Sequence, residues 1–208
     1  MSPELRTRLR DRFAWRGDRT DDSVFADLTG WWRDPDLLRD LGPALAGLFA
    51  DTEPTVVLGL QSRGFIIGPL VAAALGIGFV EVRKDPRQLS DSDAWYRCTT
   101  PPDYRDRQLH LGFPRRLVGP ADRVLLVDDW IATGGQAAGA HSLVTAAGAR
   151  WLGAAVIVDS LSDNQARRRL GVRSLLLDRH ISPYWTHPWL PARTPPRRRW
   201  LSGPRGRC

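Results

Sequence analysis

The sequence predicts an α/β fold in which a mainly parallel sheet is flanked by helices. Three apolar runs of strand length, residues 55–60, 124–127 and 151–159, have the composition of buried parallel strands. Each run is followed by a turn and then by a stretch with helical character, which is the order of elements in α/β domains. At 208 residues the chain is long enough for a single sizeable core.

The first 50 residues predict two helices. Residues 3–13 indicate a short basic helix, and residues 15–22 are polar and rich in turn-forming residues. Asp34 followed by Pro35 is a good N-cap and first helical residue, so a helix is expected from Pro35 to about Ala50. Its apolar residues recur at helical spacing and are expected in the core: Leu37, Leu38, Leu41, Leu45, Leu48 and Phe49.

Two strands with an intervening helix come next. The first strand covers residues 55–60, and the turn at residues 61–65 (QSRGF) leads into a helix through Ala74. Leu75-Gly76 closes this helix, because glycine is common after the last helical residue. Residues 78–82 form the next strand.

A long loop is predicted for residues 86–105, which have no clear periodicity and are rich in Ser, Asp, Thr and Pro. Loops of this length in a compact domain are usually functional or disordered. Cys98 lies in this stretch with no histidine near it in sequence, so we expect an exposed, unreactive cysteine. Residues 108–111 are expected to return as a strand.

The most informative stretch is Arg123–Gly139, RVLLVDDWIATGGQAAG. Its apolar strand is expected to end at Asp128 and Asp129, which would then be exposed where the strand leaves the sheet. The turn at residues 132–136 leads into a helix over residues 137–147. Downstream, a strand at residues 151–159, a short helix at 163–170 and a last strand at 172–177 complete the domain.

This strand–turn–helix unit predicts an anion site. The first amide groups of a helix and the positive end of its dipole attract a phosphate, and glycine lets the phosphate approach the backbone. Asp128 and Asp129 would repel a phosphate, but they suit hydroxyl groups or a hydrated cation beside it. A phosphorylated sugar offers both parts. An ordinary turn of an α/β fold remains the alternative.

The net charge of +7 belongs to the C-terminal tail. Seven of the 30 basic residues lie from Arg179 onward, and the other 23 balance the 23 acidic residues. This argues against a nucleic-acid-binding face on the domain. We divide the chain into an N-terminal extension (1–22), a domain (23–180) and a Pro/Arg/Trp-rich tail (181–208) whose composition predicts disorder.

Five motifs, in order between Val24 and Leu177, resemble the type I phosphoribosyltransferases, especially the adenine phosphoribosyltransferases. VLLVDDWIATGG resembles their phosphoribosyl-pyrophosphate signature, and GLQSRGF resembles their pyrophosphate loop. The resemblance implies a doubly wound, mainly parallel sheet with a small hood from the N-terminal segment and later loops. It implies a purine-salvage enzyme that transfers a 5-phosphoribosyl group to a purine-like base and releases pyrophosphate.

The resemblance also implies roles for individual residues. Asp128 and Asp129 would hold the ribose hydroxyls and sense the developing positive charge, and Asp103 would correspond to a loop acid with a catalytic role. Val24, Phe25 and Leu161 would hold the base, although Phe25 and Leu161 could also be ordinary packing residues. The 5′-phosphate would be held by Ala132, Thr133, Gly134, Gly135 and Gln136, and the pyrophosphate by Ser62, Arg63, Arg83, Lys84 and Arg87.

Several departures from the family pattern leave a second hypothesis open. Gln61 replaces an acid, Trp130 an aliphatic residue, Gln136 a threonine and Ala26 an arginine, and Asp103 is shorter than the usual glutamate. The alternative to an enzyme is therefore a regulator that binds phosphoribosyl pyrophosphate without turnover.

The expected cofactor is Mg²⁺, which would be carried by phosphoribosyl pyrophosphate and not bound directly by the protein. The expected partners are that substrate, a nucleobase and a second copy of the chain in a homodimer, with no membrane and no specific nucleic acid. No apolar run is long enough to span a bilayer, and the charged N-terminus is unlike a secretory signal. Two cysteines form no disulfide framework, so a cytoplasmic location is expected.

Overall fold

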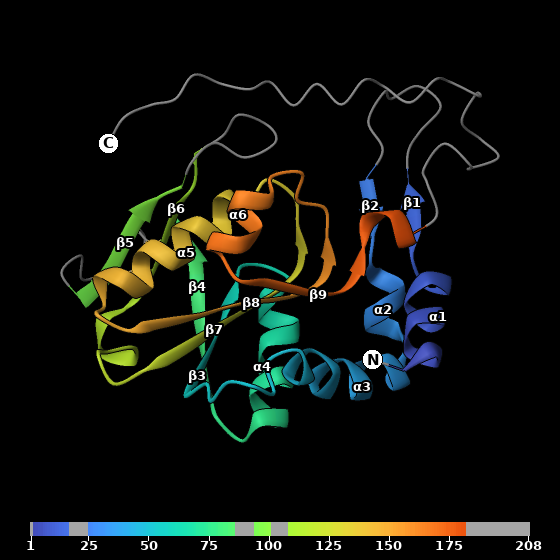
Figure 1. Cartoon of the computed structure of the whole chain (residues 1–208), viewed down its shortest axis with the longest axis horizontal. Coiled ribbons are helices and arrows are strands. Elements are labelled where there is room, and N and C mark those ends of the chain that lie inside the picture. Colours follow the sequence, from blue (N-terminus) through green and yellow to red (C-terminus); the bar gives the residue numbers. More distant parts are fainter. Residues whose placement is uncertain (1, 17–24, 86–93, 101–107, 182–208) are drawn as a thin grey trace.

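The computed structural model describes residues 2–16, 25–85, 94–100 and 108–181 and contains a twisted seven-stranded sheet (Figure 1). The strand order is β5-β6-β4-β3-β7-β8-β9. Five strands are parallel to their neighbours within this set: β3 (Val56–Leu60), β4 (Gly78–Lys84), β7 (Arg123–Ile131), β8 (Arg150–Asp159) and β9 (Val172–Leu177). β5 (Trp95–Thr99) and β6 (His110–Pro114) run antiparallel at one edge. The predicted mainly parallel, doubly wound sheet is confirmed.

Helices cover both faces of the sheet. On one face, α3 (Pro35–Gly47) and α4 (Gly64–Leu75) bury a cluster that includes Val57, Leu125 and Val127. On the other face, α5 (Gly135–Ala146) packs on a second cluster that includes Leu58 and Leu126. Alternate residues of each central strand therefore enter different cores, as the period of a strand requires. The short elements are α6 (Asn164–Arg169), η3 (Arg115–Leu117) and η4 (Asp178–His180).

The N-terminal elements form the small hood beside the α3 face (Figure 1). It consists of α1 (Pro3–Asp11), β1 (Ala14–Arg16), β2 (Phe25–Asp27) and α2 (Thr29–Arg33), and β1 pairs antiparallel with β2. Leu5 and Leu9 of α1 enter the larger core. The buried Trp31 side chain donates its indole N–H to the Leu9 carbonyl at 2.8 Å. The described part of the N-terminal extension is thus packed on the domain.

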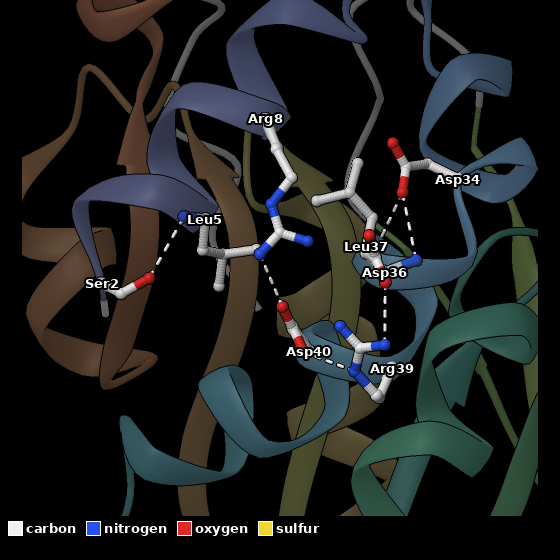
Figure 2. A network of polar contacts seen from close by, with 8 residues as sticks. All are labelled: Ser2, Leu5, Arg8, Asp34, Asp36, Leu37, Arg39 and Asp40. Atoms are coloured by element: carbon white, nitrogen blue, oxygen red, sulfur yellow. Dashed lines mark hydrogen bonds and ion pairs between the residues drawn. The ribbon is translucent and has the colours of Figure 1, made fainter.

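Polar contacts at the surface fix α1 against α3 (Figure 2). Arg8 donates to Asp40 at 2.7 Å, and Arg39 also pairs with this carboxylate. Asp34 caps α3 as expected, because its side chain accepts the amide groups of Asp36 and Leu37. Such exposed ion pairs stabilise a fold by about 0–1 kcal/mol each, so most of the attachment comes from the buried leucines of α1.

Three sequence-based expectations are wrong in detail. The strand before the acids does not end at Asp128, because β7 stays paired with β8 as far as Ile131. The loop expected at residues 86–105 contains β5, whose Tyr96 packs on Phe113 with ring centroids 5.7 Å apart. The expectation that Cys98 is exposed is also wrong, because its side chain is half-buried against the core around α5 and donates to the Gly139 carbonyl. An edge strand with alternating inward residues needs no long apolar run, so composition alone resembles a loop.

The contact between β3 and the start of α4 depends on glycine. A Cβ atom at Gly59 would lie 2.4 Å from the carbonyl oxygen of Gly64, and neither of these backbone segments can move without disturbing the strand or the helix. This close approach places the first turn of α4, and Arg63 before it, directly at the end of β3.

We predict that Gly59→Ala lowers the free energy of unfolding by about 1–3 kcal/mol, the usual cost of overpacking a core. Gly47→Ala is the matched control, since a Cβ there meets nothing within 4 Å. It should leave stability unchanged or raise it slightly. Urea denaturation of the two variants and the wild type measures the difference, and equal stability of Gly59→Ala and wild type would contradict the prediction.

Candidate active site

The turn between β7 and α5 forms an anion cradle. Gly134 has φ of 79°, a left-handed conformation that favours glycine, and it is the N-cap of α5. Thr133 is exposed, and its hydroxyl accepts the amide of Gly135 at 3.3 Å. The first amide groups of a helix have no partners within the helix and point out of its N-terminus. The arrangement suits a phosphate, with Ala132 and Gln136 flanking the turn.

The two acids at the end of β7 lie next to a cation from another strand-to-helix turn. Arg63, the residue before α4, donates to the Asp129 carboxylate at 2.8 Å. The Asp129 side chain is buried, whereas that of Arg63 remains 43% exposed and accessible to a ligand. The expectation that both acids are exposed is therefore wrong, because Asp129 is buried and Asp128 is half-buried. Because β3 and β7 are neighbours in the sheet, their following turns meet at one edge.

The Asp128 carboxyl is in a different electrostatic state. Burial, together with repulsion from the neighbouring Asp129 carboxylate, raises the pKa of Asp128 well above its ordinary value, and the positive charge of Lys84 opposes this shift. The Asp128 side chain accepts the backbone N–H of Asp129 at 3.0 Å. A positively charged ligand group beside the Asp128 carboxyl would favour its charged form.

The end of β4 contributes further cations. The backbone N–H of Lys84 donates to the side-chain oxygen of Gln61 at 2.8 Å, so Gln61 ties the end of β4 to the turn after β3. Arg83 pairs with Glu81 on the same strand at 2.5 Å. Ser62 is exposed in the turn that follows β3. This edge of the sheet therefore presents cations beside the acids and the anion cradle.

The residues predicted to hold a base lie on separate elements. Phe25 is on β2 of the hood and is 61% exposed, so it is no core residue. Leu161, after β8, is only 6% exposed and belongs to the core around α5. Its side chain lies against the cradle, because a Cβ on Gly134 would be 3.3 Å from Leu161 Cδ2. Val24, Arg87 and Asp103 lie outside the described residues.

Comparison with known proteins identifies the family of this chain. The family described as phosphoribosyl transferase domain matches residues 33–185. The chain belongs to the phosphoribosyltransferase family. An adenine phosphoribosyltransferase of Anaeromyxobacter dehalogenans is 36% identical over 181 residues, which cover 85% of this chain and 99% of that protein. Adenine phosphoribosyltransferase 1 of Triticum aestivum is 35% identical over 71% of this chain and 78% of its own.

Solved phosphoribosyltransferases share the fold. The adenine phosphoribosyltransferase of Rhodothermus marinus has a TM-score of 0.71 at 31% identity, covering 85% of this chain and 99% of that chain. The Saccharomyces cerevisiae enzyme, solved with adenine and an imino-altritol bisphosphate, has a TM-score of 0.69 at 28% identity over 83% and 98% of the two chains. The predicted type I, adenine-like phosphoribosyltransferase is confirmed, and the chain is an enzyme of that class.

Sequence reasoning about this phosphoribosyltransferase missed two features of the site. Trp130 packs on Phe13 and Trp15 of the hood, with ring centroids 6.1 and 6.2 Å apart, so an aromatic cluster joins the hood to β7. The buried Asp159 pairs with Arg167 beside Leu161. An acid that ends a long apolar strand was the available signal for the second feature, but its partner eight residues later was not evident. Within the described residues, no helix is both long and apolar enough to cross a membrane.

We predict a pH-dependent effect of Asp128→Asn on the stability of this phosphoribosyltransferase. The folded-state pKa of Asp128 is raised above its unfolded value, so its contribution to folding is most favourable at low pH and is lost as the pH rises through the folded-state pKa. Asparagine remains uncharged and avoids this loss. Relative to wild type, the variant should therefore gain stability as the pH rises above about 4, as measured by urea denaturation.

The control for this experiment is Asp36→Asn, which changes an exposed acid on α3. Its difference from wild type should vary little over the same pH range, because exposed ion pairs contribute little. A stability difference for Asp128→Asn that stays constant with pH would contradict the assigned electrostatic state.

Proposed function

We propose that the chain transfers the 5-phosphoribosyl group of phosphoribosyl pyrophosphate to a nitrogen of a purine-like base, adenine first, and releases pyrophosphate. The observation that carries this proposal is the spatial order of the anion cradle, the acids and the cations along one edge of the sheet. The acids Asp128 and Asp129 lie next to the anion cradle at Gly134 in the chain, and Asp129 contacts the cation Arg63 in space. A ribose with a phosphate at one end and a pyrophosphate at the other has the complementary order. The names of the relatives support adenine as the base.

Each charged group then has a defined task in the transfer. The amide groups at the start of α5 and the Thr133 hydroxyl hold the 5′-phosphate. Asp128 and Asp129 accept hydrogen bonds from the ribose hydroxyls and stabilise the positive charge that develops on the ribosyl group. Arg63 moves its guanidinium from Asp129 toward the departing pyrophosphate, where Lys84 and Arg83 add charge. Positioning and electrostatics are enough, because the base itself is the nucleophile.

The donor set fits magnesium that arrives on the pyrophosphate of the substrate. Mg²⁺ keeps several water ligands and commonly combines one or two carboxylates with substrate phosphates. The described residues contain no group of three or more His, Cys, Asp or Glu that could hold a metal, so the substrate would carry the ion, with Asp128 and Asp129 beside it. Bound there, the ion would neutralise charge on the leaving pyrophosphate.

Steady-state pyrophosphate release over a panel of bases tests the proposal. With Mg²⁺ and phosphoribosyl pyrophosphate, we expect turnover with adenine or a close analogue. Asp128→Asn with Asp129→Asn should reduce kcat/KM by about 100-fold or more, because transition-state charge stabilisation is lost. If calorimetry shows that phosphoribosyl pyrophosphate binds but no base is turned over, the proposal is wrong and the chain is a non-catalytic regulator.

A second experiment tests base stacking by Phe25. Because Phe25 is 61% exposed, its replacement costs little packing. Phe25→Ala should raise KM for the base by about 10-fold or more, the usual effect of losing one aromatic–base stack, with KM for phosphoribosyl pyrophosphate unchanged. Leu117→Ala is the control, since Leu117 is exposed on η3. Equal KM values for Phe25→Ala and wild type would remove Phe25 from the base site.

We further propose that the chain forms a homodimer through the outer side of α4. This helix, GFIIGPLVAAAL, is apolar all round, yet Ile66, Pro69 and Ala73 are exposed along one side. A helix that is apolar all round is normally buried, so a second copy is the simplest cover. The cytoplasmic location also remains a proposal, and it is supported by the free thiol of Cys98.

The dimer prediction is tested by light scattering after size exclusion. Ala73→Arg places a charge on the exposed side of α4 and should shift the mass toward that of one chain, because an unpaired charge is costly in an interface. Ala146→Arg is the matched control, an exposed alanine in the last turn of α5. A dimer that persists in Ala73→Arg would place the interface elsewhere.

A further inference from the structure

The end of β7 that carries the acids is held by the sheet from one side only. Among the described residues, the parallel ladder between β3 and β7 ends at Val127, before the acids, whereas β8 stays paired with β7 as far as Ile131. The ion pair between Arg63 and Asp129 bridges the open side, but Arg63 is partly exposed, and such pairs hold a segment weakly. The position of residues 128–131 therefore depends more on side-chain packing than that of the rest of β7.

Trp130 supplies packing on this stretch. The centroid of its ring lies 6.1 Å from that of Phe13 and 6.2 Å from that of Trp15. Phe13 and Trp15 contact each other edge to face, with centroids 5.1 Å apart. All three side chains are half-buried, and aromatic pairs at such separations stabilise a structure by more than their buried area alone. The cluster therefore holds the residue that directly follows Asp129.

The same cluster continues into the deeply buried part of the hood. The ring of Phe13 lies 6.2 Å from that of Trp31, whose side chain is fully buried. The indole N–H of Trp31 donates to the Leu9 carbonyl at 2.8 Å, which anchors the cluster on α1. A continuous line of contacts thus runs from the acid-bearing end of β7 through the hood to the first helix.

The hood side of this cluster lies outside the matched family domain. The phosphoribosyltransferase match covers residues 33–185, whereas Phe13 lies between α1 and β1, and Trp15 belongs to β1. Trp130 lies inside the match, but it is one of the departures of this chain from the family pattern. The contact between the hood and the acid stretch is therefore a feature of this chain that the family match does not describe.

We propose that Phe13, Trp15 and Trp130 are positioning residues, through which the hood holds the acid pair in the geometry that turnover needs. This inference rests on the proposed function, in which Asp128 and Asp129 accept hydrogen bonds from the ribose hydroxyls. A displacement of about 1 Å at a reacting group can reduce a rate by about 100-fold. A support one residue away from Asp129 therefore affects turnover without touching the substrate.

The test compares two tryptophan variants. Trp130→Leu removes the ring contacts and keeps an apolar side chain. Trp151→Leu is the matched control, because Trp151 is also half-buried and packs edge to face on His141 at 5.1 Å, but it pairs with Val124 at the end of the β7–β8 ladder opposite the acids. Trp151 also donates its indole N–H to the Leu170 carbonyl at 3.0 Å, so the control disrupts at least as much local structure. Both variants should have a lower thermal midpoint than wild type.

The measurements are kcat and KM for adenine in pyrophosphate release, and a calorimetric titration with ribose 5-phosphate. For Trp130→Leu we expect kcat to fall by about 10-fold or more, because misplaced acids stabilise the transition state poorly. The affinity for ribose 5-phosphate should fall by about 3-fold or more, since hydrogen bonds to the ribose are weakened. KM for adenine should stay within about 3-fold of wild type, and the control variant should keep kcat and the ribose 5-phosphate affinity within about 2-fold.

Two milder variants keep the test decisive if Trp130→Leu does not fold. Trp130→Phe retains an aromatic ring and should keep kcat within about 3-fold of wild type. Phe13→Leu loosens the cluster from the hood side and leaves β7 unchanged in sequence. It should lower kcat in the same direction as Trp130→Leu, but by a smaller factor, because Trp15 still packs on Trp130.

Three results would overturn the inference. Similar kcat values for Trp130→Leu and Trp151→Leu, at similar thermal midpoints, would make the cluster merely structural. A higher KM for adenine with unchanged kcat would make Trp130 a contact of the base. If wild type turns over no base, the proposed function fails, but the ribose 5-phosphate titrations remain informative: an affinity equal in Trp130→Leu and wild type would show that the cluster does not position the acids.

Discussion

The contact between Arg63 and Asp129 joins the two strand-to-helix turns around which the site is built. One turn follows β3 and the other follows β7, and these neighbouring parallel strands end at the same edge of the sheet. Burial, together with repulsion between the two acids at the end of β7, raises the pKa of Asp128. Arg63 compensates the buried member of the pair and stays partly exposed. In the proposed function, Arg63 leaves Asp129 and binds the pyrophosphate of the substrate.

The glycine contacts behind this ion pair explain why it can form. β3 and the first turn of α4 approach so closely that Gly59 and Gly64 touch backbone to backbone. A side chain at either position would push α4, and therefore Arg63, away from the acids. The close packing of β3 and α4 thus determines whether Arg63 can reach Asp129 at the edge of the sheet.

The sheet edge is completed by elements from the two ends of the domain. Trp130 follows the acids directly and joins β7 to the hood through Phe13 and Trp15. On the other side, Asp159 and Arg167 hold Leu161 against the turn at Gly134. The signature strand is therefore the structural centre to which both the hood and the β8–α6 segment attach, in addition to carrying the acids.

The sequence by itself determined the class of fold, the order of most strands and helices, and the family to which the chain belongs. Local patterns carry this information: the apolar run before Asp128, the cap at Asp34 and the glycines at 134 and 135 act over a few residues. The same locality explains the errors. β5 is an edge strand whose inward residues alternate with polar ones, and Asp129 is buried by residues far away in the chain.

Only the tertiary structure decided which charged residues meet. Arg63 and Asp129 are 66 positions apart, and the exposure of Phe25 together with the burial of Leu161 depends on how the hood and the β8–α6 segment pack. Partner choice among many arginines and aspartates follows from the strand order and from the close approach of helices to the sheet. A sequence pattern contains neither the strand order nor the distance between a helix and the sheet. It therefore predicts the kinds of groups at the site but not their pairing.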